Sequence, residues 1–120
     1  VDQAQAELNK VKHQRTAARQ LVRFEVEEAY RSLITAQADV QSRDTSTTIS
    51  GEWLRTEQIN FDLGLGDTED LVKAVRADLE AKARYREAVK RYNVAVLKLL
   101  QATGTLTDRI QNGTLLETRP

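Results

Sequence analysis

The only proline in this chain is its last residue, Pro120, so the commonest helix breaker is absent from the interior. Glycine is also scarce, with five in 120 residues. No stretch of useful length alternates apolar and polar residues in the way that a half-buried strand would. The chain is therefore predicted to be all-α, with long helices and few interruptions.

A stripe of mostly apolar residues recurs in steps of four and three through the first forty residues, which is the spacing of one helical face. Its members are Ala4, Leu8, Val11, Arg15, Ala18, Val22, Val26, Ala29, Leu33, Ala36 and Val40. A second stripe lies beside it and comprises Ala17, Leu21, Phe24, Tyr30 and Ile34. So broad a face predicts more than one neighbour for this stretch.

Residues 42–51 interrupt the apolar pattern with serine and threonine, whose hydroxyls compete for backbone groups. A linker is one interpretation. Because the segment has no proline and the apolar pattern resumes at Trp53, we favour a helix that continues with a weak or kinked middle.

The strongest local signal is the segment Phe61-Asp62-Leu63-Gly64-Leu65-Gly66-Asp67-Thr68-Glu69-Asp70. Gly64 can adopt the left-handed conformation just past a helix end, and Gly66 allows the chain to turn. Asp67 can cap a new helix, with Asp70 three residues later in a variant of the capping box. The segment predicts a tight turn between two helices.

A heptad-like pattern follows the turn and ends at Thr103-Gly104, where we expect the second helix to stop. It consists of Leu71, Val75, Tyr85, Val89, Tyr92, Val96 and Leu99, with Ala74, Ala77, Ala81, Ala88 and Ala95 alongside. The expected fold is a long antiparallel, coiled-coil-like helical hairpin with a short C-terminal helical tail. It forms a single helical module over 1–120, with helix one at about 2–63, a tip turn at 64–67, helix two at about 68–102 and a tail at 103–120.

The two predicted arms are unequal, because 1.5 Å per residue gives roughly 90 Å for the first helix and roughly 50 Å for the second. Folding back at the turn then leaves residues 1 to about 30 without a partner in the chain. That stretch carries the broad apolar face, so we expect another chain or further sequence to cover it.

Several functional classes are disfavoured by composition. The chain has no cysteine and one histidine, His13, which argues against a disulfide framework, a Cys or His zinc cluster, a thiol nucleophile and the usual histidine-centred triad. Eighteen basic residues balance eighteen acidic ones, so charge does not point to a nucleic-acid partner or an anionic membrane. We expect no catalytic residue, no metal site and no cofactor, and therefore no enzyme.

These features together resemble the outer-membrane efflux protein family, the TolC-like channels. The resemblance extends from Val1-Asp2-Gln3-Ala4-Gln5 through Val26-Glu27-Glu28-Ala29-Tyr30 to Leu99-Leu100-Gln101-Ala102-Thr103-Gly104. Its sharpest part is Phe61-Asp62-Leu63-Gly64-Leu65-Gly66, followed by Asp70-Leu71-Val72-Lys73-Ala74. In such proteins an aromatic residue, two further residues, a glycine and an acidic-aliphatic pair mark the periplasmic tip of a helical hairpin.

The resemblance implies a periplasmic part of a trimeric outer-membrane channel of a Gram-negative bacterium, used for drug efflux or type I protein secretion. The chain would be the helical hairpin of the second structural repeat, and its tail would belong to the belt around the tunnel. Contact with the membrane would occur only through a β-barrel that is missing from this chain. A periplasmic adaptor protein is the implied partner.

The same resemblance assigns the site residues. The tip turn would dock the helical hairpin of the adaptor through Phe61, Leu63, Gly64, Leu65, Gly66, Asp67 and Thr68, although the glycines can also serve turn geometry alone. Asp70 would face the channel aperture, although a carboxylate near a helix start explains it equally well. The alternatives are an adaptor-type hairpin or a stand-alone coiled-coil scaffold that self-associates.

Overall fold

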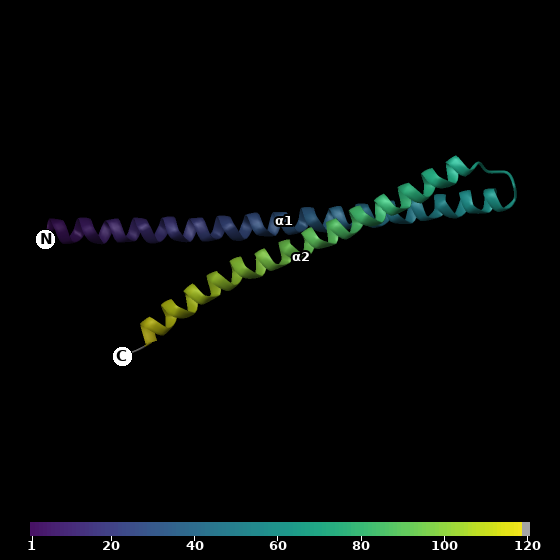
Figure 1. Ribbon diagram of the computed structural model, residues 1–120. Coiled ribbons are helices and arrows are strands. Elements are labelled where there is room, and N and C mark those ends of the chain that lie inside the picture. Colours follow the sequence, from purple (N-terminus) through teal and green to yellow (C-terminus); the bar gives the residue numbers. More distant parts are fainter. Residues whose placement is uncertain (119–120) are drawn as a thin grey trace. The chain divides into compact units, whose positions relative to one another are not determined.

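The computed structural model describes the backbone of residues 1–118 and the side chains of residues 1–104. It contains two helices, α1 (Asp2–Asp62) and α2 (Thr68–Thr118), which are joined by residues 63–67 (Figure 1). The described residues include no strand, so the predicted all-α class is confirmed. The chain divides into two compact units.

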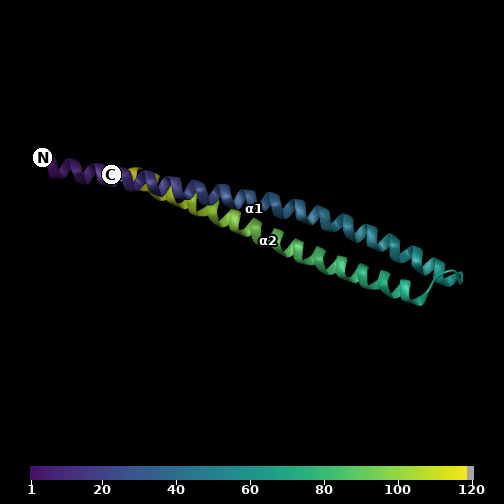
Figure 2. The same ribbon diagram turned by 90° about the horizontal axis from the view of Figure 1, so that it is seen from above.

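The first of these, the hairpin unit, spans Leu33–Val94 and contains the end of α1, the connection and the start of α2. The two helical segments run antiparallel, with the teal connection at one end; they lie side by side in Figure 2 and cross at a shallow angle in Figure 1. The predicted antiparallel hairpin is therefore confirmed. Helix α1 ends one residue before the predicted position, and α2 begins at Thr68 as expected.

The interior of the hairpin unit is thin, because α2 contributes mainly alanine to it. Ala74 and Ala88 are 0% and 1% exposed, and Ala81, midway between them, is half-buried. These three residues recur every seven positions, so they lie on one face of α2. Each buried methyl contributes only about 0.8 kcal/mol of hydrophobic free energy, so the two helices bury little apolar surface against each other.

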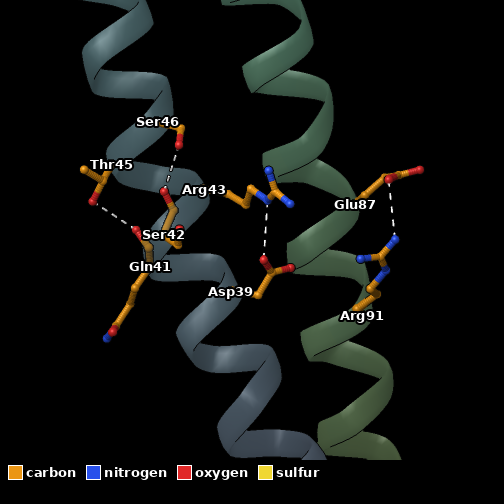
Figure 3. Close-up of polar contacts among 8 residues, drawn as sticks. All are labelled: Asp39, Gln41, Ser42, Arg43, Thr45, Ser46, Glu87 and Arg91. Atoms are coloured by element: carbon orange, nitrogen blue, oxygen red, sulfur yellow. Dashed lines mark hydrogen bonds and ion pairs between the residues drawn. The ribbon is translucent and has the colours of Figure 1, made fainter.

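Residues 42–51 are helical throughout, which confirms the continuous first helix. The helix accommodates the hydroxyl groups, because they bond to carbonyl oxygens of the same helix. Thr45 Oγ1 donates to the Gln41 carbonyl over 3.1 Å, and Ser46 Oγ donates to the Ser42 carbonyl over 3.1 Å (Figure 3). Thr47, Thr48 and Ser50 make bonds of the same kind.

Charged side chains also occupy the space between the two helices. Asp39 and Arg43 of α1 form an ion pair of 3.4 Å and reach toward α2, and both are only partly exposed (Figure 3). On α2, Glu87 and Arg91 pair over 3.7 Å with both side chains mostly in solvent. Such pairs contribute little to stability when exposed, so they do not compensate for the thin interior.

The predicted end of the second helix at 102 is wrong, because α2 continues through Thr103 and Gly104 to Thr118. Thr103 Oγ1 bonds to the Leu99 carbonyl over 2.9 Å inside the helix, and Gly104 does not take a left-handed conformation. A single glycine inside a helix costs only about 1 kcal/mol, which the continuing backbone bonds offset. The predicted tail is thus helical to residue 118 as part of α2, and residues 119–120 lie outside the described residues.

The second unit, here the terminal unit, combines Val1–Ser32 with α2 from Ala95 onward. Residues 1–21 are exposed, as expected for a segment without a partner. Val22, however, is only 5% exposed, and Val26 is half-buried, so the prediction for residues 22 to 30 is wrong in part. The prediction assumed a second helix ending at 102, whereas α2 has 51 residues and its part from Ala95 onward belongs to this unit.

Candidate interaction tip

The end of α1 is closed by a Schellman motif. The N–H of Gly64 donates to the Phe61 carbonyl over 3.0 Å, and the N–H of Leu65 donates to the Asn60 carbonyl over 2.8 Å. Gly64 has a φ of 74°, the left-handed conformation that glycine adopts without a steric penalty. The predicted left-handed conformation of Gly64 is confirmed.

Glycine is needed at position 66 for a different reason, because the backbone there lies close to the end of α1. Its N–H also donates to the Asn60 carbonyl, over 3.0 Å. A Cβ atom at Gly66 would lie 3.1 Å from the Phe61 nitrogen and 3.2 Å from the Asn60 carbonyl carbon. Because both of these are backbone atoms, only glycine fits here without a shift of the chain.

Asp67 caps the start of α2, as predicted. Its Oδ1 accepts a bond from the Glu69 N–H over 3.4 Å, and its carbonyl accepts the first helical bond, from the Leu71 N–H, over 3.2 Å. The other half of a capping box does not form, since Asp70 makes no hydrogen bond or ion pair among the described residues. The Asp70 side chain is exposed.

The apolar side chains of the tip point into solvent. Leu65 is 79% exposed, Leu63 is 67% exposed and Phe61 is also exposed. Thr68 is exposed on the first turn of α2. The structure therefore brings the predicted tip residues together around one five-residue connection, residues 63–67, in which main-chain bonds fix the turn and two leucine side chains remain uncovered.

The sequence analysis missed the charge of the tip. Between Arg55 and Lys73 the chain has no basic residue and five acidic ones, which we call the acidic collar: Glu57, Asp62, Asp67, Glu69 and Asp70. One ion pair is present within the described residues of the collar, between Glu69 and Lys73 over 3.3 Å, and both side chains are mostly in solvent. The absence of lysine and arginine from residues 56–72 could have indicated this charge, but the balanced total charge of the chain conceals it.

Other parts of the described chain offer no competing site. Within it, no group of three His, Asp or Glu side chains could hold a metal ion. His13 lines an open depression on α1 together with Lys10 and Gln14, and has no second ligand beside it. The candidate site is accordingly the tip.

Comparisons with protein-family models, with curated proteins and with solved structures found no match for this chain. Among the described residues, neither helix has an apolar stretch of the length and hydropathy needed to cross a membrane. The function is therefore argued from the geometry and charge of the tip and from the exposed helix faces.

Proposed function

We propose that this chain is a periplasmic tunnel segment of a TolC-like outer-membrane channel in a Gram-negative cell, and that its hairpin tip docks a periplasmic adaptor protein. The observation that carries the proposal is the tip, where Leu63 and Leu65 are held in solvent by a turn built from main-chain bonds. Exposed leucines on a fixed turn suit insertion between the helices of a partner. The mechanism is passive, and no reaction is catalysed.

The acidic collar defines the partner chemistry further. A surface that meets Leu63 and Leu65 has to offer an apolar pocket and, around it, basic side chains that complement the carboxylates. Electrostatic attraction of this kind raises the association rate and weakens as salt is added. The docking partner is therefore expected to present lysine or arginine at its own tip.

The long helices support assembly with further helices. Large apolar side chains are exposed on both of them, including Ile49 and Trp53 of α1 and Leu79 of α2. An interior made of alanine cannot cover such residues, so neighbouring hairpins are the natural cover. Assembly as a trimer in the complete channel would place three copies of Asp70 near one another at the aperture, where like charges repel.

The exposed apolar faces also favour a second candidate, a stand-alone coiled-coil scaffold that self-associates. This candidate needs no adaptor and assigns no role to Leu63 or Leu65. The two candidates therefore differ in what they predict for substitutions at the tip.

The experiment measures binding of purified adaptor hairpins to the full chain by calorimetry, with light scattering to follow the oligomeric mass. The test variant is Leu63→Ser with Leu65→Ser, and the matched control is Leu79→Ser, an exposed leucine of α2 away from the tip. We expect binding to the parent chain and to the control, and a loss of about 2 kcal/mol or more in the tip variant.

Two outcomes would overturn the proposal. Equal binding by the tip variant and the parent would remove the tip from the interface. Self-association of the chain, without binding to any adaptor hairpin at low salt, would favour the scaffold instead.

A further inference from the structure

The alanine face of α2 does not define its own alignment with α1. Ala74, Ala81 and Ala88 repeat every seven residues, so a slide of one heptad replaces each alanine by another. The alanines alone therefore do not oppose such a slide. The turn at 63–67 favours one register, and a residue within the helices can oppose the others.

Asp78 breaks the repetition. It lies in the row that accompanies the alanines at the same seven-residue spacing, which consists of Leu71, Asp78, Tyr85 and Tyr92. Asp78 is 4% exposed, whereas the three other members of the row are half-buried. A carboxylate is thus the most buried member of an otherwise apolar and aromatic row.

The surroundings of Asp78 are incompletely matched to its charge. Oδ2 forms an ion pair with Lys82 Nζ over 2.8 Å. Oδ1 is buried and has no hydrogen-bond donor among the described residues. On α1, a Cβ atom added to Gly51 would lie 3.9 Å from Oδ1. The adjacent Ser50 is buried too, but its hydroxyl bonds within α1, to the Ser46 carbonyl over 2.9 Å.

A slide of one heptad would worsen this environment in either direction. One direction sets residue 44 opposite Asp78, which brings the carboxylate of Asp44 toward a buried carboxylate. The other direction sets residue 58 there, which puts the long side chain of Gln58 where Gly51 leaves space. The observed register is the one of these three in which the residue opposite Asp78 has no side chain.

We propose that Asp78, seated against Gly51, is a register residue of the hairpin, which acts together with the turn to hold one alignment of the two helices. A buried carboxylate with one unmatched oxygen contributes little to stability. It does raise the free energy of any alignment in which its surroundings are less favourable. The inference goes beyond the proposed function, since it concerns the hairpin whatever its tip binds.

The absence of cysteine allows a direct test with paired cysteines in the full chain. Because the helices are antiparallel, residue 37 lies two heptads before Gly51 and residue 92 lies two heptads after Asp78. The observed register therefore sets residue 37 opposite residue 92. The native reporter is therefore Gln37→Cys with Tyr92→Cys. The slid alignments are reported by Gln37→Cys with Tyr85→Cys and by Asp44→Cys with Tyr92→Cys.

Each reporter is oxidised in the parent chain, in Asp78→Leu and in Asp78→Ala, with Glu80→Ala, an exposed acid of the same helix, as the matched control. In the parent and the control we expect the native cross-link. In both Asp78 variants, cross-linking of a slid pair should rise about tenfold relative to the native pair. The thermal midpoint of these variants should stay equal or rise, because an unmatched buried charge has been removed.

This combination separates register selection from ordinary stabilisation. A residue that only stabilised the hairpin would lower the thermal midpoint of both variants and leave the cross-linking pattern native. Cross-linking confined to the native pair in folded Asp78→Leu would overturn the inference. Adaptor binding does not enter these readouts, so failure here is independent of failure of the proposed function.

Discussion

The N–H of Leu65 bonds to the carbonyl oxygen of Asn60 over 2.8 Å, while the Leu65 side chain stays 79% exposed. The turn is therefore closed by the main chain of a residue whose side chain takes no part in closing it. Stability of the turn depends on Gly64, Gly66 and Asp67, whereas the surface offered to a partner depends on the leucines. Substitutions of the glycines or of Asp67 should therefore change the stability of the hairpin, whereas substitutions of the leucines should change mainly its exposed surface.

Gly64→Ala should destabilise the hairpin by about 1 kcal/mol, because a Cβ atom is strained at a left-handed φ. Gly64→Asn should cost less, since asparagine tolerates this conformation better. The measurement is urea unfolding followed by circular dichroism at one fixed protein concentration. Gly104→Ala is the control, and it should stabilise, because Gly104 lies within α2 with open space around its Cβ position.

Gly66→Ala should destabilise for a different reason, with a cost of about 1 to 3 kcal/mol from overlap with the backbone of α1. Gly66→Asn should bring no relief, because space rather than φ is limiting at this position. The same unfolding assay applies. Recovery of stability with asparagine at 66 would contradict the steric explanation.

Gly51→Ala should stabilise the chain by about 0.5 to 1 kcal/mol, because a Cβ atom at that position makes only an ordinary contact with Asp78 and alanine favours the helix. Gly51→Leu should do the opposite, since its side chain would enter the space beside Asp78. Unfolding curves of the two variants at matched concentration provide the check. A loss of stability with alanine would mean that the helices approach more closely here than the 3.9 Å contact indicates.

Asp67→Ala should cost about 0.5 to 1 kcal/mol through loss of the N-cap of α2, the lower part of the usual range because the bond to Glu69 is long. Asp67→Ser should recover most of the loss. Asp70→Ala serves as the control, and it should change the unfolding free energy by less than about 0.5 kcal/mol because that side chain has no described partner. Equal losses at the two positions would point to the helix dipole instead of the cap.

The tip could be predicted because its determinants are local. Gly64, Gly66 and Asp67 act on atoms within a few residues of themselves, so their order in the sequence is sufficient to define the turn. Gly104 shows the limit of the same logic, since a glycine stops a helix only when no continuing bonds outweigh its cost. The prediction of a helix end at 102 was wrong because it treated the glycine as sufficient to stop the helix.

Asp78 could not be identified from periodicity, because its position in the heptad row is that of an ordinary core residue. Its buried carboxylate lies beside Gly51 of the opposite helix, which is 27 positions earlier in the chain. The acidic collar was missed for another reason, since its carboxylates are dispersed over the end of α1, the connection and the start of α2, and the total charge of the chain is balanced.

The division at the tip between main-chain closure and exposed side chains has a consequence for how such a hairpin can diversify. Residues 63 and 65 can be exchanged without rebuilding the loop, because no bond of the Schellman motif uses their side chains. Under the proposed docking role, substitutions at these two positions would change the apolar part of the docking surface and leave the main-chain bonds of the turn in place. Under the same proposal, duplicated copies of such a hairpin can keep one architecture and present different side chains at residues 63 and 65 to different partners.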